Sequence, residues 1–451
     1  MKLESIKLHN FRRFKGWHTL DLDRSLTVLA ANNGAGKSSL LDAVAIALGP
    51  FLSRLPKIVG NALTDRDLTM DHTALTMDHT AKTDRFTQIV ASTYAEIGFG
   101  KEETPLAAPL IWDRMRRVKN AGRTLYLRKE GAAQRSSRDL KAINLLADFF
   151  LDHAEGETMF PVLAYYGTGR AVLNVPQRKR GFGKAFSRFQ AYDGCLKPET
   201  NFKTLFEYFY FLEDLERREK IEKQNLNHQN RELDAIRAAV ESCLPEYRNP
   251  HTGIRPVRFL INRVSDGRSF SIEQLSDGYK TTLAMVMDIA IRMVEANPSK
   301  GAAALSASGI VLIDELELHL HPSWQQRIIP DLRRTFPNVQ FICTTYSPQV
   351  LSTVPPESIR TISEEGRISK TSCKTYGAES KRVLEELMLV ESRPNIHRAE
   401  LKKFIRITDA GDWSSEDYHK LRSLLVDSLG ESDPVLIEAD IKKQFQELEA
   451  E

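Results

Sequence analysis

The chain has 451 residues, of which 41% are hydrophobic and 27% are charged, and its formal net charge is only +3. This length is enough for about two or three domains with cores of their own, and the nearly balanced charge excludes a generic polycation. Any binding of nucleic acid must therefore come from local basic patches. The four cysteines form no Cys-x-x-Cys pair, and no apolar run reaches the roughly 18 residues of a membrane span. These features favour a cytoplasmic protein with reduced thiols and no membrane segment.

The start of the chain predicts a pair of strands followed by a third, buried strand. Apolar residues alternate over Leu3–Leu8 and again over Trp17–Leu22, which is typical of an antiparallel pair. The run Leu26–Leu29 is aliphatic throughout, as expected for a strand that is covered on both faces.

A phosphate-binding loop is predicted directly after this third strand. The sequence continues through a glycine-rich turn into a helix from Ser38 to Leu48. Backbone amides of such a turn wrap phosphates, Lys37 reaches the outer phosphates, and the Ser38 hydroxyl is a magnesium ligand. Ala31 stands where the usual pattern has its first glycine, which matters only if the turn needs a positive φ there. The predicted nucleotide-binding residues of this loop are Asn32, Asn33, Gly34, Ala35, Gly36, Lys37, Ser38 and Ser39.

A duplicated polar segment and an antiparallel meander follow. Leu68–Ala74 is repeated at Leu75–Ala81, and its Asp and His side chains either bind a metal or, as we favour, lie in a solvated inserted loop. Strand-like runs at Phe86–Phe99, Leu110–Val118 and Thr124–Leu127 indicate hairpins. The many arginines of this region form either a solvated face or contacts to phosphates.

A second basic stretch begins after the predicted buried strand Pro161–Tyr166. Its cations are interleaved with phenylalanines, a composition that suits phosphate contact plus base stacking, although a glycine loop followed by an amphipathic helix explains it nearly as well. The candidate nucleic-acid-binding residues are Arg170, Arg178, Lys179, Arg180, Lys184 and Arg188. Further on, Phe202–Leu212 predicts a largely buried helix, and Glu213–Arg237 an exposed helix with a candidate break around Asn225–Asn230. This region is too short for the very long coiled-coil arms of chromosome-organising ATPases.

The second half of the chain supplies acidic residues to the same site. Gly309–Ile313 predicts a buried strand that ends in Asp314 and Glu315. Such a pair suits magnesium–nucleotide chemistry, in which Asp314 holds magnesium through water and Glu315 polarises the attacking water as a general base. We predict Lys37, Asp314 and Glu315 as catalytic residues, with Ser38 and Asp314 at the magnesium.

With these motifs in this order, the chain resembles the ABC-type ATPase heads of the RecF, SMC and OLD group from Lys2 to about Thr361. The resemblance implies an α/β fold: an ABC-type P-loop ATPase head with a mixed β-sheet and an antiparallel β arm, plus a helical insertion and a C-terminal helical region. The signature motif of this group is matched by Leu275, Ser276, Asp277 and Gly278. The resemblance further implies ATP and Mg²⁺ as ligands. It also implies a homodimer or higher homo-oligomer in which the signature motif of one subunit closes over the ATP of the other.

Two departures from the sequence pattern of this group bear on the expected rate of ATP hydrolysis. Asp277 replaces a small residue, and its carboxylate repels a phosphate. Tyr346 stands where most relatives have a histidine that senses the γ-phosphate; a tyrosine can donate a hydrogen bond but stays neutral, with an ordinary pKa near 10. We therefore expect slow hydrolysis.

A closer resemblance connects the chain to the PtuA ATPases of Septu and retron anti-phage defence systems. It rests on Asn10-Phe-Arg12, Ala164–Arg170, Thr344–Val350, Thr375–Ser380 and Arg393-Pro394. The resemblance implies a partner HNH nuclease, PtuB, and in retrons a reverse transcriptase with its RNA–DNA hybrid (msDNA). The chain itself carries no HNH, zinc or clustered-carboxylate nuclease signature.

Three functions remain open on the sequence: a nucleotide-gated scaffold that controls a nuclease, a RecF-like DNA-repair clamp on DNA, and a structural module in which ATP only joins subunits. We predict four regions. They are an N-terminal ATPase lobe with the β meander (1–165), a mainly helical insertion (166–255), a C-terminal ATPase lobe with the signature and Asp314–Glu315 (256–375), and a C-terminal helical region (376–451). The last region is either a structural brace or, as we favour, a docking surface.

Overall fold

The computed structural model describes residues 1–69, 86–94, 109–117, 140–171, 187–198, 203–254, 257–391 and 393–450. These residues form two compact units, Met1–Met388 and Leu389–Glu451. Most of the duplicated segment and the strand-like run 124–127 lie outside the described residues. The four predicted regions stay a prediction.

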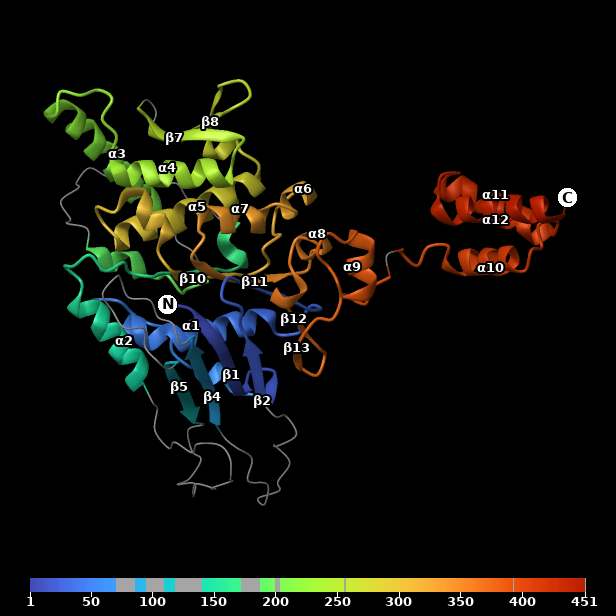
Figure 1. Ribbon diagram of the computed structural model, residues 1–451, viewed down its shortest axis with the longest axis horizontal. Coiled ribbons are helices and arrows are strands. Elements are labelled where there is room, and N and C mark those ends of the chain that lie inside the picture. The colour runs from blue at the N-terminus through green and yellow to red at the C-terminus, as the bar shows by residue number, and fades with distance from the viewer. Residues whose placement is uncertain are drawn as a thin grey trace, which may run out of the picture. The chain divides into compact units, whose positions relative to one another are not determined.

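A six-stranded mixed sheet forms the centre of the first unit (Figure 1). In spatial order its strands are β13 (Ile368–Lys370), β12 (Ile359–Ile362), β3 (Leu26–Ala30), β11 (Val339–Thr345), β10 (Gly309–Ile313) and β6 (Val162–Tyr166). β12, β3, β11, β10 and β6 run parallel, and β13 pairs antiparallel with β12. Parallel strands in this arrangement place all their carboxyl ends at one edge.

The central strands are buried because their side chains enter two different hydrophobic clusters. In β10, Ile310 and Leu312 join one cluster, while Val311 and Ile313 join the other. β6 and β3 divide their residues between the two clusters in the same alternating way. A strand covered on both faces needs a continuous apolar run, which is the pattern that the sequence shows at 309–313 and 26–29.

One face of this sheet is covered by two helices and an antiparallel sheet (Figure 1). The helices are α1 (Lys37–Arg54) and α2 (Lys141–Asp152). The four-stranded sheet has the order β2-β1-β4-β5, with β1 at Leu3–Phe11, β2 at Phe14–Asp21, β4 at Phe86–Thr93 and β5 at Ile111–Arg117. The predicted first strand pair and the antiparallel arm are confirmed, and the fold is the predicted α/β P-loop ATPase head with a mixed sheet.

The opposite face carries the remaining helices of the first unit and a small sheet (Figure 1). The helices packed there are α3 (Lys203–Glu222), α4 (Arg231–Cys243), α5 (Asp277–Ala296) and α7 (Ile328–Thr335). The sheet consists of β7 (Tyr247–Ile254), β8 (Val257–Arg263) and β9 (Ser269–Ser271). The short helices are α6 (Pro322–Gln325), α8 (Pro348–Leu351) and α9 (Ser380–Glu386), and the 3₁₀ turns are Asp65–Asp67, Thr168–Ala171, Arg188–Tyr192, Ile272–Gln274, Gly301–Ser306 and Pro356–Ser358.

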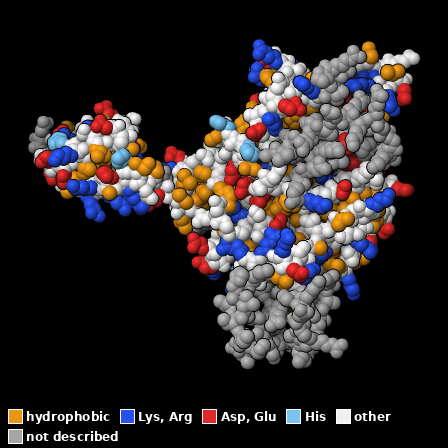
Figure 2. Space-filling model, turned by 180° about the vertical axis from the view of Figure 1, so that it is seen from behind, with side chains coloured by type: hydrophobic (Ala, Val, Ile, Leu, Met, Phe, Trp, Pro, Cys, Tyr) orange, Lys and Arg blue, Asp and Glu red, His pale blue; other side chains and the backbone are white. Residues whose placement is uncertain are grey.

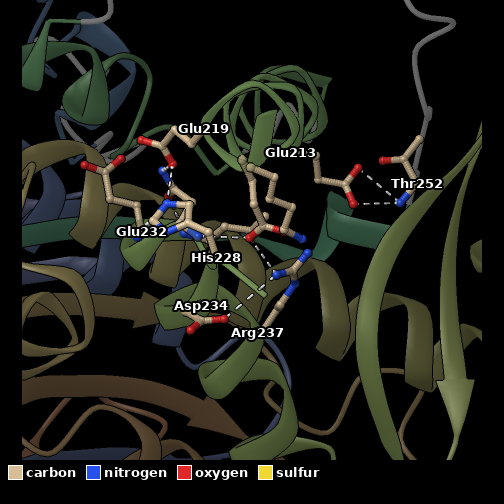
Figure 3. Close-up of polar contacts among 11 residues, drawn as sticks. Glu213, Glu219, His228, Glu232, Asp234, Arg237 and Thr252 are labelled. Carbon is tan, nitrogen blue, oxygen red and sulfur yellow. Dashed lines mark hydrogen bonds and ion pairs between the residues drawn. The ribbon is translucent and has the colours of Figure 1, made fainter. Parts of the chain in front are cut away.

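α3 and α4 form a hairpin whose charged residues are less exposed than the sequence predicts. The predicted break is confirmed, because α3 ends at Glu222 and α4 begins at Arg231. The prediction of an exposed charged helix is wrong for Glu213 and Glu216, which are both buried. Glu213 accepts a hydrogen bond of 3.0 Å from the amide of Thr252 in β7 (Figure 3). Partners across the turn and on the neighbouring strand thus satisfy carboxylates that the sequence places in a polar run.

Glu216 accepts several hydrogen bonds within the α3–α4 hairpin. Its carboxylate accepts 3.0 Å hydrogen bonds from the amide of Asn230, from Lys220 Nζ and from Arg237 Nη1. Burial raises the pKa of Glu216, but these donors together lower it by more than burial raises it. The pKa of this carboxyl therefore lies below its usual range. Near it, His228 Nε2 lies 3.0 Å from Glu219 Oε2 (Figure 3).

The second unit is a small helical bundle with a core of its own. It contains α10 (Arg398–Asp409), α11 (Glu416–Leu429) and α12 (Pro434–Ala450). Its core consists of Leu401, Phe404, Tyr418, Leu425, Leu436 and Ala439. Apolar and charged side chains are mixed on its surface (Figure 2), where Ile437, Ile441, Phe445 and Leu448 of α12 remain exposed. The described helices of the whole chain include none with the length and apolar character needed to cross a membrane.

Candidate nucleotide-binding site

Four neighbouring parallel strands deliver the predicted site residues to one edge of the central sheet. The phosphate-binding loop follows β3, and Tyr346 follows β11 directly. Asp314 and Glu315 follow β10, and Gly167–Arg170 follows β6. The register pairs Ala30 with Thr345 in β11, and Ile313 of β10 with Cys343 of the same strand. Residues that are far apart in the sequence therefore meet because their strands end side by side.

The loop conformation depends on glycine at two positions. Gly34 has φ 74° and Gly36 has φ 94°, both in the left-handed region that favours glycine. A Cβ atom on Gly36 would also lie 2.7 Å from Arg13 Cδ and 2.9 Å from the ring of Phe14. Ala31 is not among the residues with positive φ, so alanine in place of the first glycine causes no backbone strain. Asn32, Asn33 and Gly34 are exposed, as the access of a ligand requires.

Lys37 lies at the first turn of α1 and is only 4% exposed. Its Nζ atom donates to Ala31 O at 2.6 Å and to Asn32 O at 3.2 Å. The same atom lies 3.2 Å from the centre of the Tyr346 ring, a cation–π contact. Burial lowers the pKa of Lys37 to about 8, although the carboxylates of Glu317, Asp314 and Glu315 oppose the shift.

Asp314 and Glu315 are held by neighbouring backbone and hydroxyl groups. The Asp314 amide donates to Tyr166 O at 2.8 Å, and Asp314 Oδ1 accepts a hydrogen bond of 2.6 Å from Thr344 Oγ1. The amide of Glu315 donates to the same hydroxyl at 2.7 Å. Burial, together with the charges of Asp314 and Glu317, raises the pKa of Glu315 above its ordinary value. A raised pKa suits a carboxylate that accepts a proton from water.

The donor atoms at this edge fit a magnesium–nucleotide complex. The exposed hydroxyl of Ser38 and the carboxylate of Asp314 are the oxygen ligands that Mg²⁺ prefers. The first amides of α1 have no partners within the helix and, with the buried Lys37 ammonium, present positive charge to a phosphate. Bound Mg²⁺ supplies charge neutralisation at the phosphates. Ser39, half-buried, follows on the same turn.

The signature residues 275–278 lie at the start of α5. Leu275 is buried, whereas Ser276 and Asp277 are exposed, and Asp277 pairs with Lys280 at 3.2 Å. Gly278 packs against the turn after Glu315, since a Cβ atom there would lie 2.6 Å from His319 O. Within the described residues, no hydrogen bond or ion pair joins 275–278 to 31–39. Ser276 and Asp277 of the signature motif therefore face solvent within one chain.

The predicted nucleic-acid-binding set is only partly described, because Arg178, Lys179, Arg180 and Lys184 lie outside the described residues. Arg170 is buried and donates to the carbonyl oxygens of Gly167, Asp314 and Glu315. Arg188 donates to the carbonyl oxygens of Ala296, Ala154 and Thr158 and lies 3.7 Å from the centre of the Phe160 ring. Both guanidinium groups bind the chain itself, which weighs against a role for these two residues at phosphates.

Sequence reasoning missed three residues that shape the site. Glu317 accepts hydrogen bonds from Thr345 Oγ1 at 2.7 Å and from the Tyr346 amide at 2.6 Å. Thr344 bridges Asp314 and Glu315, and Arg13 donates to Gly34 O and, at 2.5 Å, to Glu364 O. The position of Glu317 two residues after Glu315 was a usable signal. Contacts made across strands and hairpins, as for Thr344 and Arg13, leave no such signal.

Fold and site together define a P-loop ATPase. A family model described as "AAA domain" matches residues 5–247, more than half of the chain, and a second, described as "AAA domain, putative AbiEii toxin, Type IV TA system", matches residues 180–352. The chain belongs to the AAA-domain family, and within it is an ATPase related to the retron ATPases and to PtuA.

The individual relatives are similar over different shares of their length. The Retron Ec83 probable ATPase of Escherichia coli is 28% identical over 99% of this chain and 88% of its own. The Septu protein PtuA of Bacillus mycoides is 47% identical, but over 17% of this chain and 10% of its own. Among solved structures, the SMC head domain from Thermotoga maritima aligns with a TM-score of 0.41 and 13% identity over 83% of this chain and 100% of that domain.

Proposed function

We propose that this protein is an ATP-binding and ATP-hydrolysing ABC-type ATPase subunit of a bacterial anti-phage defence system. In this proposal it dimerises on ATP and holds or controls a partner HNH nuclease of the PtuB kind. The observation that carries the ATPase part is the meeting of Lys37, Asp314 and Glu315 at the carboxyl edge of the parallel strands β3 and β10, which flank β11. The similarity to a retron ATPase and to PtuA supports the defence part.

In the proposed reaction, ATP and water give ADP and phosphate. Lys37 and the amides of α1 bind the phosphates, and Ser38 and Asp314 hold Mg²⁺. Glu315 accepts the proton of the attacking water, for which its raised pKa is suited. Tyr346 and Asp277 support a slow rate, since neither offers a positive charge to the γ-phosphate.

The decisive assay for hydrolysis is phosphate release by the wild type and by Glu315→Gln. Loss of a general base should lower turnover by about 10²-fold or more while nucleotide still binds. Equal turnover in both proteins would contradict the hydrolytic function and favour a module in which ATP only joins subunits.

A dimer is supported by the signature motif, whose Ser276 and Asp277 are exposed and which within one chain makes no polar contact with the phosphate-binding loop among the described residues. Subunits carrying Lys37→Ala and subunits carrying Ser276→Arg are each defective at one half of a shared site. Mixed, they should recover part of the activity because one composite site regains both halves. No recovery at all would indicate a site completed within one chain.

The partners are tested by copurification from cells, with the bound proteins and nucleic acid identified. A nuclease and, in a retron, a reverse transcriptase with its RNA–DNA hybrid are expected; duplex or gapped DNA without them would favour a RecF-like repair clamp. Binding of hybrid by Arg178, Lys179 and Arg180 is tested by neutralising all three, which should reduce the salt dependence of the affinity.

A further inference from the structure

The Gly-Thr-Gly-Arg turn after β6 ends in a buried arginine that no part of the proposed reaction uses. Arg170 is 3% exposed and lies in the 3₁₀ turn Thr168–Ala171. Its Nη1 atom donates to Asp314 O at 2.5 Å and to Gly167 O at 3.0 Å, and its Nη2 atom donates to Glu315 O at 2.6 Å. The two arms of one guanidinium group thus bind the carbonyl oxygens of two consecutive residues of the catalytic turn.

The turn that Arg170 binds has an unusual backbone. Glu315 has φ 47°, a left-handed conformation that residues other than glycine rarely adopt. Such a conformation persists only where the surroundings hold it, and it is concentrated at functional sites. Here the backbone of Glu315 is held from two sides. Thr344 Oγ1 accepts a hydrogen bond of 2.7 Å from the Glu315 amide, and Arg170 donates to the Glu315 carbonyl oxygen.

The chemistry of this contact suits arginine in particular. A guanidinium group is planar and offers parallel donors in a fixed fork, whereas a lysine ammonium is a single point with rotatable donors. Burial lowers the pKa of Arg170, but the carboxylates of Asp314, Glu317 and Glu315 oppose the shift. The acidic residues of the site therefore favour the charged form that binds the carbonyl oxygens.

We propose that Arg170 is a positioning residue for ATP hydrolysis, which holds the turn at Asp314–Glu315 in its left-handed conformation and thereby aims the Glu315 carboxylate at the attacking water. This inference rests on the proposed function of Glu315. Arg170 acts through the backbone of Glu315, so it should affect the hydrolysis step and leave the binding of nucleotide at Lys37 unchanged.

The test compares Arg170→Lys and Arg170→Met with a matched control at Arg188. Arg188 is likewise held by backbone carbonyl oxygens, those of Ala296, Ala154 and Thr158, but at the far end of α5 from the site. Single-turnover hydrolysis and the Kd for a non-hydrolysable ATP analogue are measured for each variant. Both Arg170 variants should lose about 10²-fold in the hydrolysis rate, as for a catalytic group displaced by about 1 Å, with Kd within about twofold of wild type. Arg188→Met should change neither.

Two further variants separate positioning from a general structural effect. If Arg170 acts through Glu315, then Arg170→Lys combined with Glu315→Gln should be no slower than Glu315→Gln alone. Thr344→Val removes the hydroxyl on the other side of the same peptide, so it should lower the hydrolysis rate, and it tests the held turn even if the Arg170 variants do not fold. Because the same hydroxyl also donates to the Asp314 carboxylate, the Kd of this variant is measured without magnesium, where it should match that of the wild type.

Normal hydrolysis in folded Arg170 variants would overturn the inference, as would a parallel loss of rate and binding. If instead Glu315→Gln itself leaves the rate unchanged, the proposed function of Glu315 fails. The two failures are therefore distinguishable.

Discussion

Raising the pH from about 7 to about 9 should weaken nucleotide binding, because the ammonium of Lys37, the proposed phosphate-binding residue, has an unusually low pKa. Burial lowers this pKa to about 8 in the protein without nucleotide. A phosphate beside Nζ stabilises the charged form and raises the pKa, so binding at pH values above about 8 requires the uptake of a proton. The affinity contributed by Lys37 is therefore fully present below pH 8 and is lost as the pH rises through that value.

The size of this loss of affinity follows from the pKa of Lys37 alone. With a pKa of about 8, about nine-tenths of Lys37 is protonated at pH 7 and about one-tenth at pH 9. If only the protonated form binds phosphate, the affinity falls about tenfold, or about 1.4 kcal/mol, over this range. Titration calorimetry in buffers of different ionisation heat measures both the affinity and the number of protons taken up.

Lys37→Met is the matched control, since it keeps much of the stem and removes the charge. It should bind more weakly than the wild type at pH 7 and should show no comparable loss between pH 7 and pH 9. Glu315 and Tyr346 remain in this variant, so any slope that persists belongs to them or to the nucleotide. A wild-type affinity that is constant over the range, or a slope that is the same in Lys37→Met, would refute the reasoning.

Three further predictions concern the signature loop and the stability of the fold. Gly278→Ala places a Cβ atom 2.6 Å from His319 O and should reduce the proposed ATP-dependent dimerisation, measured by light scattering, without changing the affinity of the monomer for nucleotide. Gly156→Ala is the control, since the nearest atom to its Cβ would be 3.5 Å away. Glu216→Gln should lower the free energy of unfolding at pH 7 by about 1–3 kcal/mol in denaturant titrations, because donors from Asn230, Lys220 and Arg237 lose a charged acceptor. Since folding lowers the pKa of Glu216, the extra stability of the wild type is present above the unfolded pKa near 4.5 and is lost as the pH falls through the folded pKa. Glu222 is exposed, so Glu222→Gln should have little effect on stability. Phe404 is fully buried against Tyr418, so Phe404→Ala should lower the free energy of unfolding of the second unit by about 3–5 kcal/mol. Phe445→Ala, on the exposed side of α12, should leave this free energy nearly unchanged. A fall in the rate of ATP hydrolysis with Phe404→Ala would show that the two units are coupled.

The parts of the site that the sequence could predict are those in which the residues of one short segment determine its local structure. The loop 31–38 needs glycines at positive φ and a lysine at the start of a helix, and the run Gly309–Ile313 needs apolar residues because both its faces are covered. Each of these requirements is visible within ten residues or so of the chain. The order of the strands in the sheet follows less directly, yet parallel strands that alternate with helices make a shared carboxyl edge a sound expectation.

The parts that could not be predicted are contacts between distant segments that use ordinary residue types. Arg170 looks in the sequence like the first cation of a basic stretch, and only the structure shows that its guanidinium binds the carbonyl oxygens of Asp314 and Glu315. Glu213 and Glu216 look solvated because their donors come from Thr252, Asn230 and Arg237, which lie across a turn or on another element. A polar side chain does not reveal in the sequence whether water or a backbone group satisfies it.

The state of Lys37 without nucleotide bears on whether this ATPase acts as a switch or as an engine. Its ammonium is held by two carbonyl oxygens of its own loop and by the ring of Tyr346, in a site where burial already disfavours the charge. A bound phosphate offers this buried ammonium an opposite charge. The resulting gain in binding free energy is already present in the ground state. Interactions that are equally strong in the ground state and the transition state favour tight binding and do not accelerate the chemical step. Hydrolysis then depends on the carboxylate side of the site, where Thr344 and Arg170 hold the turn of Glu315. Variants at Lys37 should therefore change mainly Kd, while variants at Glu315 and Arg170 should change mainly the rate, and a nucleotide bound tightly and hydrolysed slowly is what a switch requires.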